Sequence, residues 1–286
     1  MQENASSNTF NKAVVAAAFS PRLVNVLNES CRFLKILGAW PIIVHVGEDT
    51  PAVRVKIEEA VERSDFREHP PIFLVRSGQT ADVLIQAARE YNADLIVAGA
   101  LKKEGLFKYV VGSVARRIAR QANCSVLLLT DPQIKPQAIE KIHCIIEYDE
   151  ESQLAIFIAA AISDSDGVRD VYMTHSFRML QWEEKKSFPN NAEEIKSVYN
   201  SEDKKLKEYL EQFGPLEFVY HTQSLYESSK HSTINFTRHL RANLLIVPSP
   251  IGRLGFWDRL FPHEVELALQ DLPCSLLLVR KTNWNI

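Results

Sequence analysis

The sequence predicts an α/β protein of two tandem units, each a five-stranded parallel sheet with helices on both faces. Apolar runs of strand length alternate with segments of helical periodicity, the pattern of a parallel sheet covered by helices. The order of elements occurs twice, because the run 95–97 returns as 245–247 and the pair 124–125 as 274–275, about 150 residues later. The length of 286 residues suits two ordinary domains.

The first unit shows the clearer alternation. Its strands are expected at 13–18, 41–46, 72–76, 94–99 and 125–129, and its helices at 21–37, 51–63, 80–90 and 113–122. Because each strand is followed by a helix, the strands should run parallel.

The second unit repeats this order with an insertion. Its strands are expected near 142–147, 169–175, 216–221, 244–248 and 275–279. A histidine stands next to last in the second strand of each unit, as His45 and His175. His45 and His175 are 130 residues apart in the sequence, whereas the two fourth strands are 150 residues apart. The second unit is therefore longer by about 20 residues between its second and fourth strands. The charged stretch 181–212 is the expected insertion.

A linker is expected at 131–140, with domains at 1–130 and 141–286. The linker sequence DPQIKPQAIE contains two prolines and no periodicity, which disfavours both a helix and a central strand.

Composition excludes several classes of protein. The net charge of −3 gives no reason to expect binding to nucleic acid or to an anionic membrane. No apolar run reaches transmembrane length, and the polar start MQENASSNTF does not resemble a secretory signal. The four cysteines form no CxxC pair and the eight histidines no HxxxH or HExxH pair, so no metal site is predicted. Reduced thiols in a cytoplasmic protein are expected.

The segment 93–130 contains the strongest functional signal. An apolar strand ends at Gly99, and Gly112-Ser113 opens a helix in which Val114, Ile118 and Ala122 follow at helical spacing. Ser113 is a good N-cap, since its hydroxyl can accept a backbone N–H of the first turn. A helix start beside a glycine loop suits a phosphate. The alternative is an ordinary crossover whose glycines serve only the turns.

These features together resemble a tandem universal stress protein over nearly the whole chain. Each unit ends in the order strand, glycine loop, helix, Cys, strand. The resemblance implies a Rossmann-like fold of the adenine nucleotide alpha hydrolase type. It also implies ATP or another adenine nucleotide as ligand, with nucleotide-associated Mg as the only metal.

The family motif G-x2-G-x9-G-[S/T] is kept in part. Gly99 and Gly112-Ser113 match it, and Lys102 stands at its second glycine. A lysine there either blocks the approach of the backbone to phosphate or supplies a positive charge in its place. The implied nucleotide site consists of Ala18, Val46, Gly99, Lys102, Gly112, Ser113 and Val114.

The adenosine corner departs from the family. The family's Asp at the end of the first strand is Ala18 here, and its adenine-contacting valine is Val46. Losing one hydrogen bond to a ligand costs about 0.5–1.5 kcal/mol.

The second copy of the motif is more altered. Ser249 replaces the first glycine, Pro262-His263 replace the Gly-Ser pair, and Glu147 replaces the Asp. A proline has no N–H to donate to a phosphate. The second unit is therefore not expected to bind a nucleoside triphosphate.

Two further surfaces are candidates for association. Phe256, Trp257 and Phe261 lie in a predicted loop, where they either cover their own domain or form a partner surface. The last strands, 124–130 and 274–280, are apolar edges that should pair antiparallel within one chain. A homodimer is also compatible with the resemblance, and the protein partner is not specified.

No catalytic set can be assembled from the sequence. Some members of the family hydrolyse ATP slowly, but Ala18 gives no support for this here. The predicted function is that of a regulatory universal stress protein that binds an adenine nucleotide in its first domain. The alternative is a module without nucleotide that binds a protein, such as a transporter or a stress-response partner.

Overall fold

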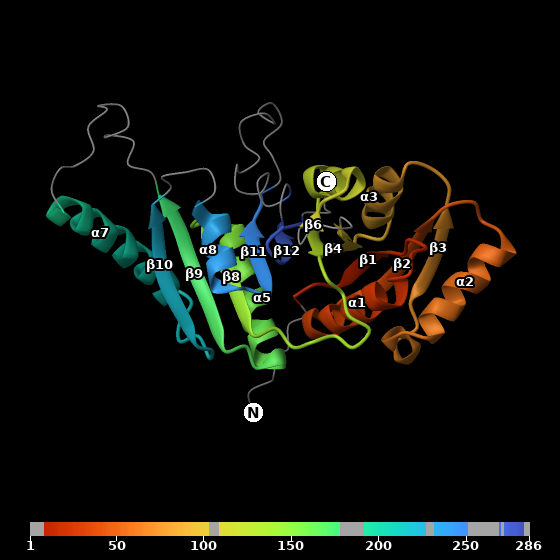
Figure 1. The fold of residues 1–286 in the computed structure, drawn as a ribbon, viewed down its shortest axis with the longest axis horizontal. Coiled ribbons are helices and arrows are strands. Elements are labelled where there is room, and N and C mark those ends of the chain that lie inside the picture. The colour runs from red at the N-terminus through yellow and green to blue at the C-terminus, as the bar shows by residue number, and fades with distance from the viewer. Residues whose placement is uncertain are drawn as a thin grey trace.

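The computed structural model describes residues 9–102, 109–177, 192–226, 232–250, 269 and 272–282. Ten strands form one sheet in the order β10-β9-β8-β11-β12-β7-β4-β1-β2-β3 (Figure 1). The sheet divides at its centre into two five-stranded halves, each parallel within itself. The predicted fold class is confirmed.

The first half alternates strands and helices as expected. Its elements are β1 (Lys12–Ala16), α1 (Leu23–Leu37), β2 (Trp40–Val46), α2 (Pro51–Glu62), a 3-10 turn (Asp65–Glu68), β3 (Ile72–Arg76), α3 (Thr80–Glu90), β4 (Leu95–Gly99), β5 (Leu101–Lys102), β6 (Tyr109–Val110), α4 (Ser113–Gln121) and β7 (Ser125–Leu129).

The second half repeats the order with a longer helix after its second strand. Its elements are β8 (Lys141–Ile145), α5 (Glu150–Asp166), β9 (Asp170–Phe177), α7 (Ala192–Glu211), β10 (Tyr220–Tyr226), α8 (Ser232–Leu240), β11 (Leu244–Pro248) and β12 (Ser275–Val279). The 20 residues of α7 lie largely in the expected insertion, against 12 for its counterpart α2.

One strand was placed wrongly by the sequence. The third strand of the second unit was expected at 216–221, but β10 begins at Tyr220. The apolar residues Leu216 and Phe218 suggested a strand, yet they lie in the turn before β10 and pack against the core.

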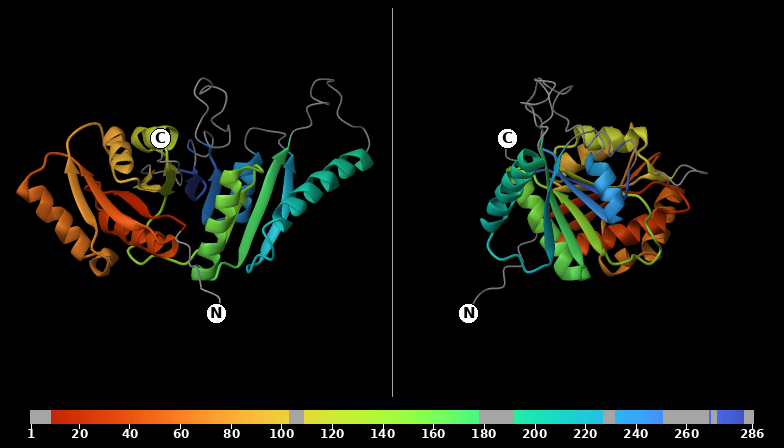
Figure 2. Two further views of the ribbon diagram at one scale, coloured as in Figure 1. Left: turned by 180° about the vertical axis from the view of Figure 1, so that it is seen from behind. Right: turned by 60° about the vertical axis from the view of Figure 1, so that its left-hand side comes forward.

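The two halves are joined by their last strands. β12 pairs with β7 in antiparallel register, with Leu277 opposite Leu127. These two residues are also equivalent in the repeat, so the junction has a pseudo-two-fold axis. The expected antiparallel pairing of the last strands within one chain is confirmed, and Figure 2 shows the two halves side by side along the long axis.

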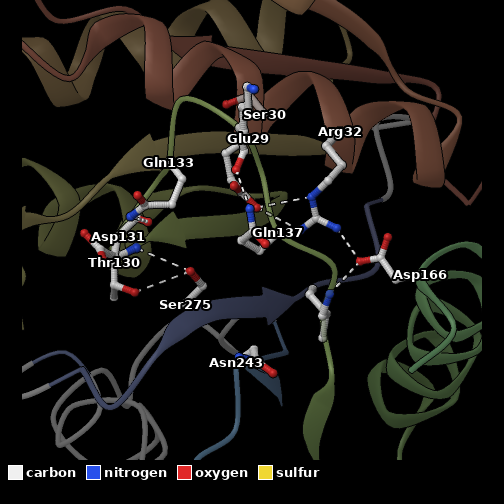
Figure 3. Close-up of polar contacts among 12 residues, drawn as sticks. Glu29, Ser30, Arg32, Thr130, Asp131, Gln133, Gln137, Asp166, Asn243 and Ser275 are labelled. Carbon is white, nitrogen blue, oxygen red and sulfur yellow. Dashed lines mark hydrogen bonds and ion pairs between the residues drawn. The ribbon is translucent and has the colours of Figure 1, made fainter. Parts of the chain in front are cut away.

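Polar contacts on one face of the sheet reinforce this junction (Figure 3). Arg32 of α1 forms an ion pair with Asp166 of α5, the equivalent helix, and the same carboxylate accepts the N–H of Ile139 at 2.9 Å. The connecting segment lies along α1, whose Asn25 and Asn28 donate to the carbonyl oxygens of Pro132 and Ile134. The connection between the halves is thus packed, not free.

The core is continuous across the junction. One apolar layer lies under α1, α2, α5 and α7, and the other lies under α3, α4 and α8. In the parts of the chain that the structure describes, no helix has the length and apolar character needed to cross a membrane.

Candidate functional site

The first half has one place where the direction of the chain connections reverses. β1 lies between β2 and β4, so the loops after β1 and β4 turn away from each other. Open α/β sheets bind ligands in the crevice at the carboxyl ends of such strands. Ala18 follows β1, Gly99 ends β4, and both are exposed.

His45 organises the turn after β1. Its ring is buried, and Nδ1 lies 2.7 Å from the carbonyl oxygen of Ala17. Because a carbonyl can only accept, Nδ1 carries the proton. A Cβ on Gly47 would lie 2.8 Å from Nε2 of His45, so a side chain at this position would force the buried ring to move.

Phe19 is a residue of this corner that the sequence analysis did not select. Its ring packs against His45 with centroids 4.1 Å apart, and yet it is 42% exposed. The ammonium of Lys56 on α2 lies 5.6 Å from the centroid of the same ring. The signal that could have identified Phe19 is an aromatic residue directly after Ala18, in a loop where exposure is costly.

The loop after β4 differs from the expected glycine loop. Lys102 belongs to β5, which pairs with β6 as a small antiparallel hairpin, opposite Tyr109. Gly99 itself has limited room, since a Cβ there would lie 3.2 Å from Cγ2 of Val26. Residues 103–108, with two further lysines, lie outside the described residues.

Ser113 does not cap α4, which corrects the sequence prediction. The N-cap residue is Gly112, with φ −62° and ψ 163°, and no side chain caps the helix. Ser113 is instead the first residue of the helix, where its hydroxyl is not placed to accept from the first turn. The N-cap residue therefore supplies no side-chain acceptor to the backbone N–H groups of this turn, and such groups can bind an anion.

The buried face of α4 also differs from the prediction. Val114 is 40% exposed, whereas Ala115, Ile118 and Ala119 are buried. Val114 thus lies beside the helix start and does not belong to the core. Arg116 donates from Nε to the carbonyl oxygen of Val111 at 3.0 Å, and this places a positive charge near the first turn.

The equivalent corner of the second half is closed. Tyr148 stands where Phe19 does, but its φ is +58°, and its ring packs on His175 and on Tyr209 of α7 with centroids 4.3 and 5.1 Å away. The hydroxyl of Tyr148 is buried without a partner among the described residues. Burial, with carboxylates such as Glu202 nearby, raises the pKa of Tyr148 to about 12.

The position of the first motif glycine is also closed in the second half. The structure corrects the prediction for Ser249: Pro248 stands at this position, because it pairs with Val279 as Gly99 pairs with Leu129, and it is buried. Ser249 follows as the equivalent of Ala100. It is 2% exposed, and its carbonyl oxygen and hydroxyl both accept from the guanidinium of Arg280, at 3.1 and 3.2 Å. Glu147, at the place of the family's Asp, is exposed. The predicted partner loop with Phe256, Trp257 and Phe261, and the pair Pro262-His263, lie outside the described residues.

The cysteines have the surroundings of structural thiols. All four are free and buried. Burial raises the pKa of Cys31 to about 11 and those of Cys124, Cys144 and Cys274 to about 12, so little thiolate forms at neutral pH. In the described ranges, no three His, Cys, Asp or Glu side chains are arranged to hold a metal ion.

Sequence comparison identifies relatives of part of the chain. Residues 44–130 match the model of the universal stress protein family. A universal stress protein of Methanocaldococcus jannaschii is 30% identical over 97 residues, which cover 34% of this chain and 55% of that protein. The match therefore spans about half the length of this curated relative.

Solved structures resemble the whole chain. A protein of unknown function from Pseudomonas aeruginosa has a TM-score of 0.69 at 13% identity, over 96% of this chain and 94% of that one. A universal stress protein from Archaeoglobus fulgidus has a TM-score of 0.62 at 12% identity, over 96% and 99%. At such identities the likeness shows the fold, and it extends over both halves.

Proposed function

We propose that the protein is a regulatory universal stress protein that binds an adenine nucleotide in its first half. Its residues 44–130 match the model of that family, and one curated member is 30% identical over 97 residues. The proposed site consists of the loops after β1, β2 and β4 and the first turn of α4. Phosphates would lie at Gly99 and at the Gly112-Ser113 helix start, and the base beside Val46.

The observation that carries this proposal is the difference between the two halves at the same position. Gly99 is exposed beside a helix start whose N-cap residue has no side chain, whereas Pro248 at the same position of the second half is buried and has no N–H to donate. A helix start of this kind attracts anions through its N–H groups and its dipole.

The base would occupy the corner formed by Ala18, Phe19 and Val46. Ala18 offers only backbone groups, so hydrogen bonds to the adenosine are fewer than with an aspartate. The exposed ring of Phe19 offers apolar surface to a planar base. Moderate affinity suits a sensor that responds to changes in nucleotide concentration.

A second candidate is an interaction module without nucleotide, for which Ala18 is the supporting observation. Its partner surface would be the loop with Phe256, Trp257 and Phe261. A cytoplasmic location, further homodimerisation and the domain boundaries 1–130, 131–140 and 141–286 remain parts of the proposal.

Released ligands and titration test the choice between these functions. Mass spectrometry of small molecules from the denatured protein should find an adenine nucleotide at near one per chain, and calorimetry should give heat with ATP, ADP or AMP. No bound nucleotide and no heat at millimolar ligand would reject the nucleotide site and favour the interaction module.

Gly112→Asp is the variant that separates charge from stability. With φ at −62°, residue 112 can accept a side chain, and aspartate is a favourable N-cap, so the helix should be at least as stable. The carboxylate would, however, occupy and repel the phosphate. Gly112→Asn is the matched neutral cap. We expect G112D to abolish binding and G112N to retain part of it, and equal binding by G112D and the wild type would contradict the site.

A further inference from the structure

Arg280 is a buried cation that joins the two halves. It follows β12 in the second half and is 3% exposed. Its guanidinium donates to the carbonyl oxygen of Ala122 at 2.9 Å and also to that of Ala119, both at the end of α4 in the first half. A further contact reaches the carbonyl oxygen of Cys124 at 3.5 Å.

The charge of Arg280 is balanced by a helix end. Among the described residues, no carboxylate forms an ion pair with it; its partners are carbonyl oxygens and the hydroxyl of Ser249. Burial lowers the pKa of Arg280 to about 10, which still leaves it protonated at neutral pH. The last carbonyl groups of a helix lack partners within the helix and carry its negative dipole end. Arg280 therefore caps the C-terminus of α4 from the other half of the chain.

The residue equivalent to Arg280 on the other side of the pseudo-two-fold axis is Thr130. The backbone N–H of Arg280 donates to Ser125 Oγ, and the N–H of Thr130 donates to Ser275 Oγ, so these residues are equivalent. Thr130, however, has a short side chain whose hydroxyl lies 3.5 Å from that of Ser275. Thr130 therefore cannot place a guanidinium on a helix end as Arg280 does.

Different contacts hold α4 along its sides and at its C-terminal end. Its side faces are held by the buried Ile118 and Ala119 and by an ion pair of Arg117 with Asp82 on α3 at 2.6 Å, whose side chains are both about half exposed. Arg280 is the buried polar contact at its C-terminal end.

We infer that Arg280 is a positioning residue for the nucleotide site of the first half, acting through α4. It holds the helix from its C-terminal end, so that the Gly112-Ser113 turn, roughly 14 Å away along a nine-residue helix, faces the phosphates. The inference rests on the proposed function. It gives the second half, whose own motif is lost, a role in the site of the first.

Arg280→Gln and Arg280→Lys in the full chain test this role. Calorimetry with ATP should show at least tenfold weaker binding for R280Q, with partial recovery in R280K, because lysine keeps the charge. Hydrogen exchange over residues 113–121 should be faster in R280Q and close to the wild type in R280K.

Two controls separate positioning from general destabilisation. Lys281→Gln removes the same charge at the next residue, whose ammonium pairs with the exposed Glu150 at 2.7 Å, and should leave affinity unchanged. Arg32→Gln breaks the ion pair with Asp166 and weakens the junction without touching α4, so it should lower the melting temperature but not the affinity.

The outcomes distinguish the two proposals. If the wild type binds no nucleotide, the proposed function fails, while hydrogen exchange still decides whether Arg280 holds α4. Unchanged hydrogen exchange over 113–121 in folded R280Q would overturn the inference. If the wild type binds ATP, an equal ATP affinity of R280Q would overturn it too. If R280Q does not fold, an R280K variant with wild-type exchange over 113–121 but at least tenfold weaker ATP binding than the wild type would overturn it as well.

Discussion

The two halves of this protein place the same histidine in the same way and then differ in what covers it. Nδ1 of His45 and of His175 each lie 2.7 Å from the carbonyl oxygen at the end of the neighbouring strand, that of Ala17 or Ile146. In the first half the aromatic residue on this histidine is exposed at the corner. In the second half it is Tyr148, turned inward at positive φ.

The difference lies in the helix that follows the second strand, which is longer in the second half. Tyr209 of α7 packs on Tyr148 and donates its hydroxyl to the carbonyl oxygen of Asp149 at 3.1 Å. The first half has Lys56 of the shorter α2 at the corresponding ring. One scaffold thus supports an open corner or a closed one, depending on the helix that follows the second strand.

The core beneath these corners also differs. His143 of β8 is fully buried and stands where the first half has Val14. Thr237 Oγ1 donates to the carbonyl oxygen of Thr233, so it must accept from Nδ1 of His143 at 2.8 Å. Nε2 then accepts from Thr174 Oγ1 at 2.8 Å. The second half ties α8 to its sheet through a directed chain of hydrogen bonds that the first half does not use.

The largest expected effect concerns the junction, where the halves should behave alike. Leu127→Ala and Leu277→Ala each remove a fully buried side chain and should each lower the free energy of unfolding by about 2–5 kcal/mol. Urea unfolding should show one transition with equal losses, and the exposed Ile134→Ala is the control. Two separate transitions, or a loss in only one variant, would show that the halves are not coupled through this pair.

The next effect should distinguish the halves by pH. Burial lowers the pKa of His143 to about 3, below its unfolded value near 6.5, so the folded state holds it neutral. Its contribution to stability is complete above pH 6.5 and is lost as pH falls toward 3. Between pH 6.5 and 5 the loss should be about 2 kcal/mol.

The pH dependence is measured by urea unfolding across this range. His143→Val, which installs the residue of the first half, should remove that part of the slope, although it leaves Thr174 without its acceptor. The same slope in H143V and the wild type would assign the pH dependence to other groups.

The smallest effect should sharpen the comparison at the corner. Tyr148→Phe removes a buried hydroxyl that has no partner among the described residues, and should raise the free energy of unfolding by about 0.5–1 kcal/mol. Phe19→Tyr adds a hydroxyl to a ring that is already exposed and should be close to neutral. A destabilised Y148F would mean that this hydroxyl has an acceptor after all.

Local pattern was sufficient for most of the fold. Period and length placed the strands of the first half within two residues, because these strands are continuous apolar runs bounded by turns. The same reasoning misplaced β10, because the apolar Leu216 and Phe218 pack against the core from the turn that precedes this strand. Gly99 and Gly112 could be selected as positions of the proposed site because the chemistry of a phosphate loop depends on the backbone.

The sequence by itself determined the alternation of strands and helices, the internal repeat and the apolar last strands, all of which are local or periodic properties. Tertiary structure decided that Gly112 and not Ser113 caps α4, that Tyr148 turns inward, and that Arg280 reaches across to the first half. These depend on contacts between residues far apart in the chain, such as Arg280 with Ala122. No local pattern encodes such contacts, because burial and hydrogen bonding to distant groups outweigh intrinsic preference.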